Sequence, residues 1–377
     1  MSLHTFSFPT QIHFGPGARK LVAEYLLAAG VQRPLIVTDQ GIADLPILAE
    51  FRSWLAGLEV AVFSGVQGNP VGAQVEAGVA AYRVHGADSV IGFGGGAALD
   101  VAKAVALMAV HPGNVFEYAW DHPSVRSIDL PLPPFVALPT TAGTGSEVGR
   151  SSVISEDDTH VKRILFSPAL LARAVFADPE LTLDLPGPIT AATGMDALTH
   201  NVESYLSPAY HPLCDGIALE GLRLAARALP LAVREPRNIE ARGDMLMASM
   251  MGAVAFQKDL GAVHSCAHAL STVNNLHHGL ANALMIEHVM RFNLPSSVQK
   301  MAEMGRVAGS EPGAEGFIAW LGRMKAEIGI PANLAAVGVS EAHLERLVDV
   351  AEKDICHQTN PRPCGREDFE RLFRSAL

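Results

Sequence analysis

The sequence predicts an α/β domain built on a parallel sheet, followed by an all-helical domain. In residues 1–186, short apolar runs rich in β-branched residues alternate with helix-like segments, a pattern typical of a parallel sheet covered by helices on both faces. In residues 187–377 these runs disappear, and apolar residues recur at spacings of three and four, as in helices. The boundary is expected where Leu185-Pro186-Gly187-Pro188 interrupts both patterns.

The elements of the first domain follow from the positions of the apolar runs and of the breaks between them. A run of buried, β-branched residues predicts a strand covered on both faces, and Gly or Pro marks the turns. The expected elements are strands Thr5–Phe8 and Gln11–Phe14 with a turn between them, a helix that follows the break at Gly15-Pro16-Gly17 and ends at Ala29, strand Leu35–Thr38, helix Pro46–Gly57, strand Glu59–Phe63, helix Gln74–His85, strands Ser89–Phe93 and Phe135–Leu138, and a hairpin attached to the sheet over Ser151–Ser167.

The second domain is expected to be helical throughout. Apolar residues at helical spacing predict helices at Ile217–Leu229, Asp244–Val254, Val298–Val307, Gly316–Ile328 and Glu341–Ala351.

Composition and charge exclude several classes of protein. The chain has 377 residues, 49% hydrophobic and 18% charged, which indicates ordered domains with sizeable cores. A formal net charge of −11 argues against nucleic-acid and anionic-membrane binding. The N-terminus has no pattern of a secretory signal, and no apolar run is long enough for a membrane span. The four cysteines form no CxxC pair, so reduced thiols in a cytoplasmic protein are expected.

A glycine-rich loop follows the strand expected at Ser89–Phe93. Gly94, Gly95 and Gly96 let the backbone approach a ligand closely, and free N–H groups at the start of the next helix favour a phosphate. The spacing does not match G-x-G-x-x-G, so a tight turn without a ligand is the alternative.

Other polar residues are expected at the same edge of the sheet, beyond the carboxyl ends of the strands, where ligands bind in open parallel sheets. Hydroxyls come from Thr140, Thr141, Thr144 and Ser146, between which lie Gly143 and Gly145. Asp39 and Asn69 follow two further strands. Asp39 would suit the hydroxyls of a ribose, and the alternative is a helix cap or turn residue.

The helical domain contains spaced carboxylate and imidazole side chains that suggest a divalent metal site. Asp196 and His200 lie four residues apart, as do His264 and His268, so each pair would share a helix face. The alternative is a set of buried histidines bonded to backbone carbonyls. Chemistry alone does not choose between His277 and His278. Cys266 would point about 160° away from His264 and His268, so no thiolate is expected, and nitrogen and oxygen ligands fit Fe²⁺, Zn²⁺, Ni²⁺, Co²⁺ or Mn²⁺.

Taken together, these motifs resemble those of the iron-dependent (group III) alcohol dehydrogenases over most of the chain. The matching segments are Thr38-Asp39, Gly94-Gly95-Gly96 with Asp100 and Lys103, Pro139-Thr140-Thr141 with Gly145-Ser146-Glu147, Gly194-Met195-Asp196 with His200, His264 with His268, and His278-Gly279 with Asn282. The resemblance implies a dinucleotide-binding α/β domain at residues 1–186, an all-helical metal-binding domain at residues 187–377, and an active site in the cleft between them.

The resemblance also implies roles for individual residues. The metal ligands would be Asp196, His200, His264 and His278, and His268 would be a catalytic residue near the metal and the nicotinamide. The cofactor residues would be Asp39, Asn69, Gly95, Gly96, Ala97, Asp100, Thr140, Thr141, Thr144, Lys162 and Leu181. Ala97 departs from the serine that the family usually has after the three glycines, which removes one hydroxyl but leaves the backbone donors.

The implied function is hydride transfer between a small alcohol, or the corresponding aldehyde or ketone, and NAD(P) in a homodimeric cytoplasmic enzyme. Asp39 favours NAD over NADP because a carboxylate repels a 2′-phosphate. Iron is the first expectation for the metal, with zinc or another divalent ion as the alternative. Two other functions are a metal- and NAD-dependent lyase similar to dehydroquinate synthase, which would need clustered basic residues, and a non-catalytic nucleotide-binding protein.

Overall fold

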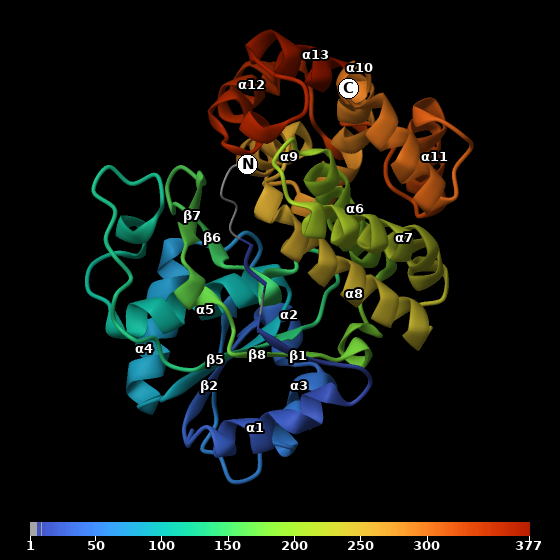
Figure 1. Ribbon diagram of the computed structural model, residues 1–377. Helices are drawn as coiled ribbons and strands as arrows, with labels where there is room; N and C mark the ends of the chain where they lie inside the picture. The colour runs from blue at the N-terminus through green and yellow to red at the C-terminus, as the bar shows by residue number, and fades with distance from the viewer. Residues whose placement is uncertain (1–5, 9) are drawn as a thin grey trace. The chain divides into compact units, whose positions relative to one another are not determined.

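The computed structural model describes residues 6–8 and 10–377, which form two compact units (Figure 1). The sheet unit comprises residues 10–141 and 146–182, and the helical unit comprises residues 6–8, 142–145 and 183–377. The predicted fold class is confirmed, and the chain passes into the helical unit after Thr182, four residues before the expected boundary at Pro186. Among the described residues, no helix has the length and apolar character that a membrane span requires.

Six parallel strands form the main sheet of the sheet unit. In sheet order they are β1 (Gln11–Phe14), β8 (Ala174–Ala177), β5 (Phe135–Pro139), β4 (Ser89–Gly94), β2 (Pro34–Asp39) and β3 (Ala61–Val66). From β2 the chain first adds β3 on one side and then β4 on the other. The strand order therefore reverses between β2 and β4, and such a switch point opens a crevice at the carboxyl ends of the two strands.

Helices cover both faces of this sheet (Figure 1). One face packs on η1 (Ala18–Leu21), α1 (Val22–Ala28) and α3 (Pro46–Ser53), and Phe51 of α3 stacks on Phe93 of β4. The other face packs on α4 (Gly72–His85) and α5 (Gly96–Val110), where Gly92 lets Leu99 approach β4. Burial on both faces explains why the central strands read as continuous apolar runs.

Two sequence predictions about strand pairing are wrong. Phe6–Phe8 form no strand, and Thr5 lies outside the described residues. The segment packs on the helical unit instead, where the Phe6 ring lies 4.2 Å from that of His211 and the Ser7 N–H donates to Gln257. β1 therefore pairs in parallel with β8, a strand that the sequence did not predict. The expected hairpin exists as β6 (Ser151–Ser155) and β7 (Lys162–Phe166), but it forms a separate two-stranded sheet.

A buried lysine fixes the segment that follows β5. Lys103 of α5 donates to the carbonyls of Ser146, Gly149 and Ser151 at 2.6–3.0 Å. On the same helix, the Asp100 carboxylate accepts the Ser146 hydroxyl at 2.6 Å and the Val153 N–H at 3.1 Å. Charged groups buried this deeply need such partners. The network therefore holds residues 146–153 against α5.

The helical unit is organised around α6 (Gly187–Leu206), which is buried along most of its length and packs on α7 (Pro212–Arg234), α8 (Ile239–Ala255) and α10 (His278–Ala308). Its other helices are α9 (Ala262–Asn274), α11 (Ala314–Glu327), α12 (Leu344–Lys353) and α13 (Arg366–Ala376). Two glycines permit close approach to α6, because a Cβ at Gly279 would lie 2.2 Å from the Ala192 carbonyl and one at Gly252 would lie 2.8 Å from the His200 Cβ.

The shorter elements complete the described chain. They are α2 (Gln40–Ala43) and the 3₁₀ turns Val115–Tyr118, Ser146–Val148, Pro168–Leu170, Pro179–Thr182, Phe256–Lys258, Ala335–Val337, Glu341–His343 and Cys356–Thr359.

Glu147 gives the sheet unit a pH-dependent stability. The residue is 1% exposed, its Oε1 has no hydrogen-bond partner among the described residues, and burial raises its pKa to about 7 from the usual 4.5. The protonated form is therefore favoured in the folded state. Its contribution to stability is complete below pH 4.5 and is lost as the pH rises through 7.

We expect Glu147→Gln to remove this loss, because the amide cannot ionise. The unfolding free energy of the variant minus that of the wild type should rise by roughly 2–3 kcal/mol as the pH goes from 5 to 8. Urea unfolding of both proteins at the two pH values measures the difference. An equal pH dependence in the two proteins would show that Glu147 does not carry it.

Candidate metal centre and cofactor site

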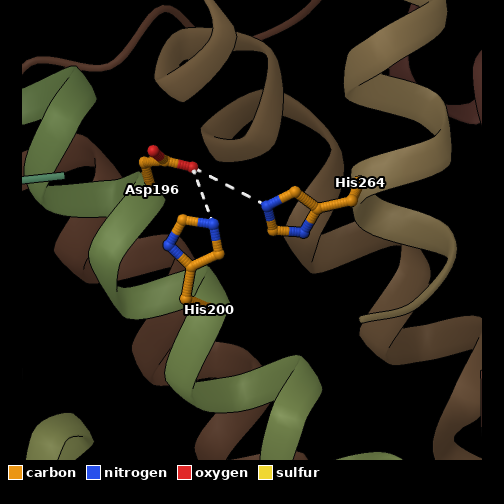
Figure 2. Close-up of side chains that lie close together, drawn as sticks. All are labelled: Asp196, His200 and His264. Carbon is orange, nitrogen blue, oxygen red and sulfur yellow. Dashed lines mark ion pairs between the residues drawn. The ribbon is translucent and has the colours of Figure 1, made fainter. Parts of the chain in front are cut away.

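Asp196 and His200 project from one face of α6, as their spacing predicts (Figure 2). The two residues are 2% and 4% exposed, and His200 Nε2 lies 3.7 Å from Asp196 Oδ1. Both side chains are therefore buried in a region where an unpaired charge would be costly.

Two further helices bring imidazoles to the same carboxylate oxygen. His264 of α9 is 1% exposed, and its Nε2 lies 3.7 Å from Asp196 Oδ1. His278, the first residue of α10, places Nε2 at 3.5 Å. The possible ligand atoms of Asp196, His200 and His264 all lie within 4.8 Å of one another. Figure 2 shows these three side chains pointing toward one another. The structure thus brings together all four residues that the sequence analysis named as metal ligands.

An amide group lies among these ligand atoms. Nδ2 of Asn282 is 2.7 Å from Asp196 Oδ1 and 3.3 Å from Nε2 of both His264 and His278. An amide nitrogen carries two protons, so it cannot serve three acceptors at full strength. Neutral imidazoles therefore leave the cluster with more lone pairs than donors.

The charges in this cluster are strongly coupled. Burial alone would raise the pKa of Asp196, but His200, His278 and His264 lower it well below its usual range. Burial lowers the pKa of His200 to about 4, so that this ring is neutral at pH 7. Burial opposes protonation of His264 too, but bonds to Asp196 and Glu203 raise its pKa to about 9.

The donor set fits a divalent transition-metal ion. It combines one carboxylate oxygen with three imidazole nitrogens, a set suited to Fe²⁺, Zn²⁺ and related ions. His264 Nδ1 lies 2.6 Å from Glu203 Oε2, so the other ring nitrogen, Nε2, is the one directed at Asp196. Cys266 is not among the ligand atoms, and burial raises its pKa well above 9, which keeps the thiol protonated.

His268 belongs to a neighbouring cluster. Its Nδ1 lies 2.7 Å from Asp354 Oδ2, and its ring stacks on His278 with centroids 5.3 Å apart. Asp354 also accepts the Ser265 hydroxyl at 2.7 Å and the Cys356 N–H at 2.9 Å. The Asp354 bond therefore holds Nδ1 and fixes the orientation of the His268 ring.

The sheet unit gathers several predicted cofactor residues at its switch point. Gly95 precedes α5 and Gly96 begins it, and both are partly exposed. A Cβ at Gly94 would lie 2.7 Å from Ala98 and 3.1 Å from Asp39 Oδ2, and one at Gly95 would lie 3.2 Å from Thr141. A side chain at either position would therefore crowd its neighbours, and the start of α5 is a place where backbone N–H groups favour an anion.

Asp39 has a structural contact in addition to its predicted role in cofactor binding. Its Oδ1 caps α2 by accepting the Ile42 N–H at 3.0 Å, as the alternative interpretation predicted. Burial raises the pKa of this carboxyl group. Because Oδ2 faces Gly94, capping does not remove Asp39 from the switch point.

The other predicted cofactor residues lie in different surroundings. Asp100 uses both carboxylate oxygens to hold Ser146 and Val153, and Leu181 is 4% exposed within the apolar core, so the structure gives both a role in the fold. The Thr140 N–H donates to Gly94 O at 3.0 Å. Asn69 lies beyond β3, Ala97 lies in the first turn of α5, Lys162 begins β7, and Thr144 belongs to the helical unit.

The sequence analysis gave no role to three residues that contact the proposed ligand histidines or His268, although it named Asn282 within a matched motif. Glu203 follows Asp196 by seven residues, a spacing that places both on one face of α6 and could have identified it. Asn282 lies one turn after His278, and the same argument applies. Asp354 has no local signal, because 86 residues separate it from His268.

The chain is similar to known proteins along nearly its whole length. The chain matches the family model described as iron-containing alcohol dehydrogenase over residues 9–179 and that of the family's C-terminal domain over residues 190–377. It is 38% identical to a 4-hydroxybutyrate dehydrogenase of Cupriavidus necator, with 98% of each chain covered. It is 35% identical to an NAD-dependent methanol dehydrogenase of Bacillus methanolicus, with 99% of each covered. The crystal structure of a 1,3-propanediol oxidoreductase superposes with a TM-score of 0.94 at 36% identity, covering 99% of this chain and 100% of the other.

We expect His264→Ala to lose the bound divalent ion and most turnover, because the change removes one of the three imidazoles that face Asp196. Binding of NAD should persist, since Asp39 and Gly95 belong to the other unit. Elemental analysis and a fluorescence titration with NADH measure the two effects. His288→Ala is the control, because His288 lies on α10 but bonds to Ser375 at 2.9 Å. A full metal content in His264→Ala would contradict the ligand assignment.

Proposed function

The chain belongs to the iron-containing alcohol dehydrogenase family, and we propose that it oxidises a small diol or ω-hydroxy acid with NAD at an iron site. Membership makes it a metal-dependent oxidoreductase that transfers a hydride between an alcohol and NAD(P). The convergence of Asp196 and three imidazoles is the observation that carries the proposal. Since the relatives reported above are dehydrogenases and an oxidoreductase, neither alternative function is retained.

The chemistry divides between the bound groups and the residues of the chain. When bound, a divalent ion supplies Lewis acidity that lowers the pKa of an alcohol hydroxyl, and NAD supplies the hydride acceptor. Asp196 would contribute the negative charge of the ligand set, while His200, His264 and His278 would contribute imidazole nitrogens, which are neutral when they bind an ion. Glu203 and Asn282 would orient the side chains that hold the ion.

His268 is proposed as the proton carrier. The Asp354 carboxylate holds its Nδ1 at 2.7 Å and so fixes the ring, which leaves Nε2 to accept the hydroxyl proton. The side chain is 14% exposed, which gives the proton a route to solvent. Asp354 would stabilise the imidazolium that forms, as a neighbouring carboxylate does.

The position of Asp39 supports NAD as the cofactor. Its Oδ2 lies beside Gly94 at the switch point, where it would meet an adenosine ribose. A carboxylate accepts hydrogen bonds from the two ribose hydroxyls and repels a 2′-phosphate. The NAD-dependent relative from Bacillus methanolicus adds to this support.

The substrate proposal draws on the relatives. Two of them are named for 4-hydroxybutyrate and 1,3-propanediol, which are short chains with a terminal hydroxyl and a second polar group. We propose substrates of that kind, iron as the ion, and a homodimer as the assembly. Oxidation of such a chain yields the corresponding aldehyde.

Activity with metal-restored enzyme tests the proposal. Protein treated with a chelator and reloaded with Fe²⁺ should form NADH with 4-hydroxybutyrate or 1,3-propanediol, and at least tenfold more slowly with methanol. Zn²⁺ reloading, measured in parallel, tests the choice of metal. Absence of NADH formation with all three alcohols under Fe²⁺ or Zn²⁺ would refute the proposed activity.

We expect Asp39→Gly to increase kcat/KM for NADP by about tenfold, because like charges near a protein surface repel by roughly 1–4 kcal/mol. Asp39→Asn should produce a similar gain, since it removes the charge and keeps an oxygen that can cap α2. Initial rates with NAD and NADP give the ratio. An unchanged ratio in both variants would mean that Asp39 does not face the ribose.

A further inference from the structure

Glu203 is a second buried carboxylate beside the proposed metal ligands. It lies on α6 two turns after Asp196 and is 2% exposed. Its Oε2 lies 2.6 Å from His264 Nδ1, the ring nitrogen directed away from Asp196. A buried carboxylate at this distance holds Nδ1 and fixes the orientation of the ring, so that Nε2, the nitrogen that would bind an ion, faces Asp196 Oδ1.

The same carboxylate holds the beginning of α9. Oε1 accepts the Val263 N–H at 2.7 Å, and Oε2 accepts the His264 N–H at 3.3 Å. Both N–H groups belong to the first turn of α9, where a backbone N–H has no acceptor within the helix and negative charge is favourable. Gly261 makes the approach possible, because a Cβ there would lie 2.6 Å from Glu203 Oε1. Glu203 therefore controls both where His264 lies and how its ring is oriented.

Charge balance gives Glu203 a further role. The two carboxylates of Asp196 and Glu203 would match the charge of a divalent cation, because imidazoles that bind an ion are neutral and add no charge. Without Glu203, a positive charge would be left in a buried cluster, where unpaired charge is costly. Its carboxylate also makes the opposite nitrogen of His264 a stronger donor.

We propose that Glu203 is a positioning residue that sets the metal affinity of the site by orienting His264 and balancing the charge of the ion. The inference rests on the proposed metal ligands and goes beyond them, because Glu203 need not touch the ion. Its effect is expected mainly on metal binding and retention, with turnover following from metal content.

Glu203→Gln tests the proposal against a matched control. Asn360 also accepts an N–H at the beginning of α9, that of Ala262 at 3.2 Å, and its other hydrogen bonds join it to Asn293 and Arg362 and not to the His264 ring. In full-length protein freed of metal by a chelator, Co²⁺ is the probe, and its visible absorption and competition with a chelating dye report affinity and geometry. Thermal unfolding of the metal-free proteins reports stability.

Glu203→Gln should weaken Co²⁺ binding by about 10–100-fold and change the absorption band, whereas Asn360→Ala should lower stability and bind Co²⁺ within about twofold of wild type. Unchanged Co²⁺ affinity in Glu203→Gln, or an equal loss in Asn360→Ala, would overturn the proposal. If the glutamine variant does not fold, Glu203→Asp is judged by the same criteria. Its shorter side chain keeps the negative charge but moves the carboxylate oxygens away from His264. Retention of metal by His264→Ala would instead refute the ligand assignment itself.

Discussion

The buried carboxylate of Asp196 is the constraint on which the helical unit depends. Only 2% of the residue is exposed, so its charge must be compensated by protein groups or by an ion. Three imidazoles and the Asn282 amide surround one oxygen at 2.7–3.7 Å. Reaching that oxygen requires α10 to approach α6 closely, which Gly279 permits by lacking a Cβ. The close packing of α10 on α6 therefore determines which side chains surround Asp196.

The sheet unit meets a different constraint with buried charges of its own. The strand order reverses between β2 and β4, where Gly94 lies close to Asp39, and the segment of residues 146–153 that follows β5 is held against α5. Lys103 does this by donating to three backbone carbonyls. Burial lowers the pKa of Lys103 to about 8, which is the cost of using a cation as an anchor in the interior.

Local sequence pattern predicted the central strands and the main helices well, and it failed where the choice of partner mattered. The β4 run Ser89–Gly94 is apolar because both faces are covered, and this is visible in the sequence. The strand that pairs with β1 cannot be read from the local sequence, since β8 lies about 160 residues further along the chain. Phe6–Phe8 looked like a strand because alternating apolar residues suit a strand or an irregular segment packed on a helical surface.

The sequence by itself determined which carboxylate and imidazole side chains of the candidate site share a helix face. Spacings of four place Asp196 with His200 and His264 with His268, because the turn of a helix is a local property of the chain. Only the tertiary structure decided which ring nitrogen meets which carboxylate. His264 turns Nδ1 to Glu203 and Nε2 to Asp196, whereas Nδ1 of His268 meets Asp354 from a distant segment. Those pairings depend on how separate helices approach one another. Helical periodicity carries no information about the distance or the angle between two helices.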